Sequence, residues 1–307
     1  MSQGFEITFH NRKENKRDIE KIYGDSMIRF AYDSFIGKML SPIVSSRSLS
    51  KIYGSTQDTL KSGRKVPQFV KDFNIDLSIY NKGSLEADKA ENSYKSFNEF
   101  FIRTFKDGQR EFTEDKNKLA ACAEARYFGH EAIKDDLVVP VKGTMIKATD
   151  LIGNEKRAKD FIGGPFVIAR LCPVDYHRYH YPDSGKTIES FLVPGEFHSV
   201  NPIALKYKND ILIKNERRVS ILETENFGKL AYIEVGATCV GKIVQTFDEK
   251  KSFDRGDEKG YFLFGGSTVI ICGEAGKWKP SLDILENTKL GLETYIELGD
   301  EIATITN

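Results

Sequence analysis

The spacing of apolar residues changes once along this chain, near residue 119. Before that point, from about residue 18 to residue 110, apolar side chains recur at helical spacing. After it, short apolar runs rich in Val, Ile, Tyr and Phe are separated by Gly, Pro, Asn and Asp, a pattern typical of strands joined by tight turns. The sequence therefore predicts an α+β fold, with N-terminal helices packed on a mostly antiparallel β body.

Two N-terminal segments carry the strongest helical pattern. Residues 25–42, DSMIRFAYDSFIGKMLSP, form an amphipathic and basic stretch in which Ser26 can cap the helix and Pro42 ends it. Such a helix lies either on a membrane surface or against the body of its own protein. Residues 96–111, SFNEFFIRTFKDGQRE, place four phenylalanines on one face, which predicts a core-facing helix that closes the N-terminal region.

The amino-acid composition limits the classes of protein to which this chain can belong. The 307 residues are 40% hydrophobic, enough for a core, and 45 basic residues balance 45 acidic ones, so the overall charge does not indicate a nucleic-acid partner. Residues 1–70 hold a basic surplus, twelve Lys and Arg against seven Asp and Glu. The four cysteines are widely separated, and we expect free thiols. No apolar run reaches the roughly 18 residues of a membrane-spanning helix, so we expect a soluble or peripheral protein.

Ionisable side chains crowd into residues 170–186, RLCPVDYHRYHYPDSGK. Two of the five histidines, His177 and His180, lie there between two prolines, in a stretch too interrupted for a long helix. Such crowding is costly unless the groups are exposed or used, which favours a catalytic role over loop histidines that only form hydrogen bonds. With Cys172, the histidines could also serve a metal-dependent hydrolase, but motifs such as HExxH are absent and we expect no metal site.

A second candidate lies in YFLFGGSTVI, residues 261–270, where Gly265 and Gly266 interrupt an apolar strand. The peptide bond from Gly266 to Ser267 has little steric shielding, and the glycines allow backbone angles that other residues resist. With a base nearby, the Ser267 hydroxyl could attack the carbonyl before it, form an ester from its own backbone and break the chain. The alternative interpretation is a glycine bulge in an ordinary strand.

Taken in order, the motifs of this chain resemble those of the phosphatidylserine decarboxylase family. The matching segments are IEKIYG, FAYDSFIG, SFNEFFIRTFKDGQRE, VPVKG, LCPVDYHRYHYPDSG, PGEFHSVNPIAL, NERRV, YIEVGATCVGKI and FGGST. They extend over nearly the whole chain, and DYHRxHxP and GST are the most specific of them.

The resemblance implies a chain that cleaves itself between Gly266 and Ser267 into a β chain, residues 1–266, and an α chain, residues 267–307. Ser267 would become a pyruvoyl group. Its ketone would form a Schiff base with the amine of phosphatidylserine and accept the electrons released with carbon dioxide, giving phosphatidylethanolamine.

The resemblance also assigns roles to the ionisable residues. His180 would be the base that activates Ser267 for self-cleavage, backed by an acidic residue, and His177 would act near the substrate carboxylate and in proton delivery. In AACAEARYFG, residues 120–129, Glu124 takes the place of the family's Asp. The added methylene moves the carboxylate by roughly an ångström, a displacement that can cost about a hundredfold in rate.

A second departure from the family pattern is Lys242, which stands where a small residue is common. We have no interpretation of Lys242. Glu124 and the basic amphipathic N-terminal region together make a non-cleaving relative that binds anionic lipid without decarboxylating it the main alternative.

The resemblance further implies a membrane-associating helical region, residues 1–118, and a β-rich catalytic domain, residues 119–307. The expected partners are phosphatidylserine, a membrane surface on its cytoplasmic face, and a second copy in a homodimer. The C-terminal IELGDEIATI resembles the Gly-Asp turn of barrel-sandwich hybrid folds, so we expect the β body to be of that type.

Overall fold

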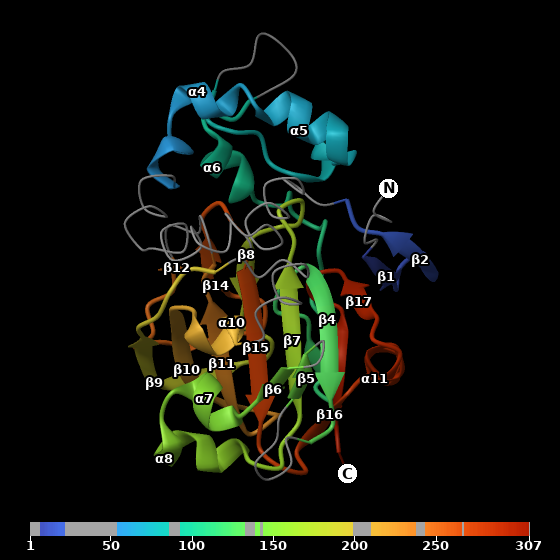
Figure 1. The fold of residues 1–307 in the computed structure, drawn as a ribbon, viewed down its shortest axis with the longest axis vertical. Helices are drawn as coiled ribbons and strands as arrows, with labels where there is room; N and C mark the ends of the chain where they lie inside the picture. The colour runs from blue at the N-terminus through green and yellow to red at the C-terminus, as the bar shows by residue number, and fades with distance from the viewer. Residues whose placement is uncertain are drawn as a thin grey trace, which may run out of the picture.

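A ten-stranded sheet forms the centre of the molecule (Figure 1). The structure is a computed structural model and describes residues 7–21, 54–85, 93–132, 139–141, 144–198, 210–237, 243–265 and 267–306. Within this sheet each pairing of neighbouring strands is antiparallel except that of β1 with β17. The α+β class and the mostly antiparallel arrangement predicted from the sequence are therefore confirmed.

The strands of the large sheet lie in a spatial order that differs from their order in the chain. From edge to edge they are β13 (Ser252–Phe253), β9 (Gly185–Val193), β10 (Arg217–Thr224), β11 (Lys229–Val235), β15 (Ser267–Gly273), β7 (Phe166–Leu171), β4 (Ala125–His130), β17 (Glu293–Ile296), β1 (Thr8–Asn11) and β2 (Lys16–Ile19). The strand that begins at Ser267 is thus central, between β11 and β7. Its run of Val and Ile is buried along its whole length, as expected for a strand covered on both faces.

Three smaller sheets and several short helices complete the fold. The small sheets are β12 (Ile243–Gln245), β14 (Glu258–Phe262) and β8 (Arg178–His180); β16 (Trp278–Pro280), β18 (Glu301–Ile305) and β3 (Lys118–Ala120); and β5 (Val139–Val141) with β6 (Thr144–Ile146). The helices are α4 (Leu60–Gly63), α5 (Val66–Phe73), α6 (Phe97–Phe101), α7 (Ala148–Ile152), α8 (Glu155–Ala158), α10 (Ile211–Lys214) and α11 (Leu282–Lys289), with 3-10 turns η1 (Leu77–Ile79) and η2 (Lys159–Phe161). No helix in the described part is long and apolar enough to cross a membrane.

Helices α4, α5 and α6 lie together at one end of the large sheet, at the top of Figure 1. Aromatic side chains of α5 and α6 form a small core that also includes Phe264, three residues before Ser267. The Phe97 and Phe264 rings meet edge to face with centroids 4.9 Å apart. The Phe264 amide also donates a hydrogen bond to Asn98 Oδ1 at 2.9 Å. These contacts tie α6 to the loop that leads into β15.

The helix predicted over residues 96–111 is shorter than expected, because α6 covers only Phe97–Phe101. Beyond it, the side chain of Arg103 turns into the interior and is buried. Phe105 then forms an isolated β-bridge with Tyr80 and stacks on its ring. The predicted extent of the helix was therefore wrong, since these tertiary contacts replace the helix predicted over residues 102–111.

The N-terminal region contains strands as well as helices, because β1 and β2 extend the large sheet beyond β17. The helix predicted over residues 25–42 lies outside the described residues. The boundary at residues 118 and 119 and the barrel-sandwich hybrid type both stay predictions.

Candidate functional site

Ser267 is the first residue of β15, where it pairs with Leu171 of β7. The residue is fully buried, and within the described part of the chain its Oγ atom has no hydrogen-bond partner. A buried hydroxyl left unpaired costs about 1–3 kcal/mol, so it marks either strain or a reacting group. Gly265 has φ of 149°, a conformation that side chains disfavour, and Gly266 lies outside the described residues.

His177 lies beside the loop that carries Gly265. Its ring stacks at a tilt on Phe101 of α6, with centroids 3.7 Å apart, and Phe101 in turn packs on Phe264. The Nδ1 atom is 3.0 Å from the carbonyl oxygen of Asp175. Because a carbonyl only accepts, Nδ1 carries the proton and Nε2 is left with its lone pair. Nε2 has no hydrogen-bond partner among the described residues.

Burial sets the charge of His177. The ring is fully buried, and this burial lowers its pKa to about 3, although the backbone carbonyls of Asp175 and Gly265 partly oppose the shift. The imidazole is therefore neutral at physiological pH, and a pKa this low also makes it a weak proton acceptor. A buried neutral imidazole beside the glycine loop is a candidate base for self-cleavage chemistry.

His180 faces a different set of neighbours. It ends β8, its Nδ1 lies 2.8 Å from the carbonyl oxygen of Gly256, and its Nε2 lies 3.3 Å from the Tyr176 hydroxyl. Burial lowers its pKa as well. Among the described residues no hydrogen bond joins His180 to Ser267 or to Glu124. The predicted role of His180 as the base stays a prediction.

Glu124 is held by two other side chains. Arg110 binds both of its carboxylate oxygens, with Nε to Oε2 at 2.7 Å and Nη2 to Oε1 at 3.2 Å. The Tyr295 hydroxyl donates to Oε1 at 2.8 Å. In the part of the chain that is described, Glu124 makes no hydrogen bond to either histidine or to Ser267. The structure thus brings His177 to the cleavage loop but does not join Glu124 to it.

Asp175 contacts His177 through its backbone carbonyl, and the sequence pattern gave Asp175 no separate role. Its Oδ2 accepts from Arg126 Nη1 at 2.6 Å and from the Cys172 amide at 2.7 Å, while its backbone carbonyl holds the His177 ring. Burial raises the pKa of Asp175 to about 6, against the opposing charge of Arg126. The feature of the sequence that could have identified Asp175 is its position in DYHR, two residues before His177.

The metal-site alternative finds no support in the geometry. The Sγ atom of Cys172 lies 2.9 Å from a guanidinium nitrogen of Arg170, and one nitrogen of each histidine faces a backbone carbonyl. No group of three or more His, Cys, Asp or Glu side chains in the described part is arranged to hold a metal ion. Lys242 lies outside the described residues.

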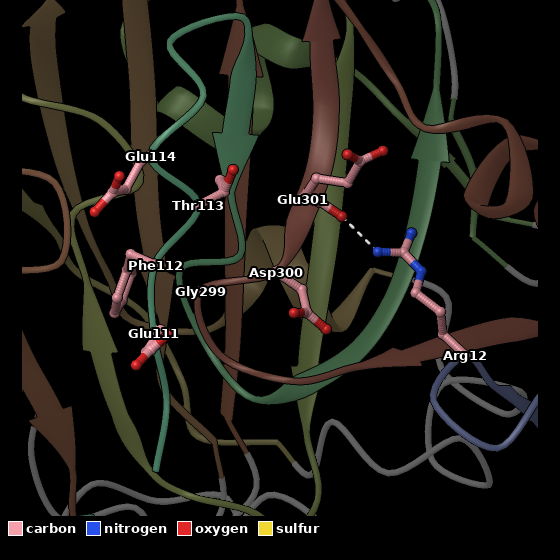
Figure 2. A pocket seen from close by; sticks show the side chains of 8 residues that line it. All are labelled: Arg12, Glu111, Phe112, Thr113, Glu114, Gly299, Asp300 and Glu301. Carbon is pink, nitrogen blue, oxygen red and sulfur yellow. Dashed lines mark hydrogen bonds between the residues drawn. The ribbon is translucent and has the colours of Figure 1, made fainter. Parts of the chain in front are cut away.

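A pocket of about 900 Å³ opens elsewhere, on the far side of Phe112 from His180, and Ser267 does not line it. Figure 2 shows its lining, which consists of Arg12, Glu111, Phe112, Thr113, Glu114, Gly299, Asp300 and Glu301. Arg12 donates to the backbone carbonyl of Glu301 and is paired with Asp283. Four carboxylates against one engaged guanidinium disfavour an anionic ligand. One lining residue approaches the histidines, since the Phe112 ring lies 5.7 Å from the His180 ring.

Comparisons with known proteins agree with the order of motifs in the sequence. A family model described as phosphatidylserine decarboxylase matches residues 97–303. A phosphatidylserine decarboxylase proenzyme of Clostridium perfringens is 41% identical over 297 residues, covering 96% of this chain and 99% of that protein. The proteins of the same name from Clostridium tetani and Clostridium novyi are 40% and 39% identical; the matches cover 96% and 97% of this chain and 97% and 99% of theirs.

Proposed function

The chain belongs to the phosphatidylserine decarboxylase family, and from this premise we propose that it is a proenzyme that cuts its own backbone to make the group it uses for decarboxylation. Cleavage between Gly266 and Ser267 would convert Ser267 into a pyruvoyl group, and the processed enzyme would convert phosphatidylserine into phosphatidylethanolamine. The observation that carries the proposal is the buried Ser267 hydroxyl, which has no hydrogen-bond partner in the described part of the chain.

The first step is an acyl shift within the chain. The Ser267 oxygen forms a bond to the Gly266 carbonyl carbon, the bond from that carbon to the Ser267 nitrogen breaks, and a base takes the hydroxyl proton that the nitrogen later receives. Removal of the Ser267 Cα proton then expels the Gly266 carboxylate. Addition of water and loss of ammonia leave a keto-acyl N-terminus on residues 267–307. That carbonyl supplies an electron sink for loss of carbon dioxide from the substrate.

Two features of the chain fit this group. Ser267 is enclosed among apolar strands, which excludes bulk water from the reacting carbonyl. His177 is a neutral base with its Nε2 lone pair available, and the Gly265 backbone acts on its ring. We therefore propose His177 as the base for the self-cleavage step. The assignment of that step to His180 by resemblance is the competing prediction.

The position of β15 supports a product in which the two chains stay together. After cleavage, residues 267–307 would still supply β15 between β11 and β7, with β17 beside β4 and β18 beside β3. The α chain would therefore remain part of the sheets of the β chain without a covalent bond.

The membrane and dimer assignments are also proposals. The substrate's acyl chains cannot leave a bilayer cheaply, so the enzyme would work as a peripheral protein on the cytoplasmic face. The basic and apolar residues around 27–51 would dock it there, and a homodimer is the proposed assembly. The barrel-sandwich hybrid type belongs with these proposals.

One observation favours the alternative function, a relative that binds anionic lipid without cleaving itself. Glu124 stands where the family has Asp, and its carboxylate is bound by Arg110 and Tyr295. A wild-type chain that stays intact at pH 7 to 8 while it binds anionic vesicles would support this alternative.

The proposed function is tested by replacing Ser267 with Ala. We expect S267A to stay uncut and to produce no phosphatidylethanolamine from phosphatidylserine vesicles, whereas the wild-type chain does both. Decarboxylation by the uncut variant would contradict the proposal, since no keto group could form.

A further inference from the structure

Five charged side chains are buried together behind the segment that carries His177. They are Glu20, Arg126, Arg170, Asp175 and Glu293, each 7% exposed or less. They come from five separate parts of the chain: the end of the β1–β2 hairpin, β4, β7, the loop before β8, and β17. Buried charges at this density need close partners, because desolvation of an unpaired charge costs several kcal/mol.

Glu20 is the member that joins the two arginines. Its Oε2 lies 2.6 Å from Arg170 Nη2, a hydrogen-bonded ion pair, and 3.2 Å from Arg126 Nε, an ion pair without hydrogen-bond geometry, since Arg126 Nε has no hydrogen-bond partner among the described residues. Glu293 binds Arg170 in the same two-pronged way, at 2.8 and 2.6 Å, but Arg126 is not among its partners. The charges of Arg170 and Arg126 outweigh the effect of burial on Glu20 and lower its pKa to about 2. Glu20 is therefore ionised throughout the physiological range.

Arg126 also contacts Asp175. The guanidinium faces Glu20 through Nε and Asp175 through Nη1, the latter at 2.6 Å. The same Asp175 oxygen accepts the Cys172 amide, and the Asp175 carbonyl contacts His177 Nδ1. A continuous path of direct contacts thus runs from Glu20 through Arg126 and Asp175 to His177.

The position of Glu20 in the chain shows which parts of the molecule this path of contacts connects. Its amide donates to the carbonyl of Ile7 at 2.8 Å, which closes the β1–β2 hairpin. Lys21 is the last described residue before residues 22–53, the segment that includes the basic amphipathic sequence. Glu20 therefore links the β1–β2 hairpin to the segment before His177.

We propose that Glu20 is a positioning residue that fixes the segment Cys172–His177 through Arg126, and so couples the β1–β2 hairpin to the self-cleavage site. The effect on cleavage rests on the proposed function, whereas the effect on the loop does not. Without the Glu20 charge, Arg126 loses one of the two carboxylates that orient it, and the Asp175 carboxylate loses its fixed partner.

The test compares three full-length variants with matched changes. Glu20→Gln removes the carboxylate that touches Arg126. Glu293→Gln removes a carboxylate from the same cluster that binds Arg170, and it controls for the general loss of a buried charge. Asp18→Asn removes a half-buried carboxylate from the same hairpin that contacts Asn11 and Lys16.

The first readout is hydrogen exchange of peptides covering residues 172–177, measured by mass spectrometry on Ser267→Ala versions so that every chain is intact. We expect E20Q to speed exchange there about tenfold, E293Q to have less than a third of that effect, and D18N to have none. Equal effects of E20Q and E293Q, or no effect of E20Q, would overturn the inference.

The second readout is the rate at which chains with Ser267 cleave themselves. We expect E20Q to slow cleavage about tenfold at a temperature where its folded fraction equals that of E293Q. Unchanged cleavage in E20Q would overturn the coupling to the site. If the wild-type chain never cleaves, the proposed function fails, and the hydrogen-exchange result still decides whether Glu20 positions the loop.

Discussion

Ser267 and His177 gain their chemical character from burial. The hydroxyl lies where water cannot solvate it, and the imidazole is kept neutral because its pKa falls to about 3. The Nδ1 contact with the Asp175 carbonyl keeps Nε2 free of the proton, although the low pKa that keeps the ring neutral also makes it a weak base. His180 has the same tautomer, but the Tyr176 hydroxyl lies on its Nε2.

Alanine variants of the two histidines separate their roles. We expect His177→Ala to slow self-cleavage by about a hundredfold or more, the usual effect of losing a general base. His180→Ala should slow it less, because that ring faces Gly256 and Tyr176. The measurement is the fraction of cut chain over time, with circular dichroism as the control for folding. The reverse ranking would return the role of base to His180, as the resemblance implies.

The sequence was sufficient to single out Ser267, the glycines before it and the histidine pair. Local patterns reveal them, since GGST and DYHRYH are contiguous. The cluster around Arg126 could not be found this way, because Glu20, Asp175 and Glu293 are far apart in the chain and meet only when β1, β4, β7 and β17 pair. Glu124 looked like a partner of a histidine from motif position alone, and its contacts with Arg110 and Tyr295 depend on the same strand pairing.

At the scale of elements, β15 and α6 decide where the reaction can occur. β15 presents Ser267 at its first position between two neighbouring strands, and α6 fixes the preceding loop through Asn98 and the Phe97 and Phe101 rings. The apolar runs predicted these strands well. The length of α6 was not predictable from periodicity, because the interior contacts of Arg103 and Phe105 outcompete a continued helix.

The turn before β4 offers a test of the departure at Glu124. We expect the wild-type chain and Glu124→Asp both to cleave, with the variant destabilised by about 1–3 kcal/mol because the shorter side chain cannot hold both Arg110 and Tyr295. The measurements are thermal unfolding and the rate of cleavage. Cleavage in Glu124→Asp but not in the wild type would show that the geometry of this carboxylate blocks the reaction, and the chain would then be the silent relative.

At the scale of the whole molecule, the buried ionisable groups couple stability to pH. His177 binds a proton near pH 6.5 when unfolded and near 3 when folded, so it removes up to about 5 kcal/mol of stability as pH falls across that interval. Glu20 contributes up to about 3 kcal/mol above pH 4.5, which is lost toward pH 2. Asp175 has the opposite effect on stability. Because its pKa is raised to about 6, the folded chain binds a proton there before the unfolded chain does, so Asp175 adds stability as pH falls from about 6 to about 4.

These contributions predict a two-stage acid response. Between pH 6.5 and about 4 the stability gained by protonation of Asp175 offsets much of the stability lost at His177, so Tm should fall slowly. Below about pH 4 the stability gained at Asp175 is complete, while the contributions of His177 and Glu20 to stability continue to decrease, so Tm should fall steeply. The check is Tm across pH 3 to 8 for uncut Ser267→Ala protein, with and without His177→Gln. An equal slope through both intervals would contradict these assignments.

The most direct test of the central proposal is the intact mass of freshly purified wild-type protein under denaturing conditions. We expect two species from the 34.8 kDa chain: residues 1–266 with an ordinary C-terminus, and residues 267–307 with a keto-acyl group in place of the serine N-terminus. The small species should lack a free amine at its N-terminus. A single full-length mass with an unmodified Ser267, persisting after long incubation at pH 7 to 8, would contradict the account.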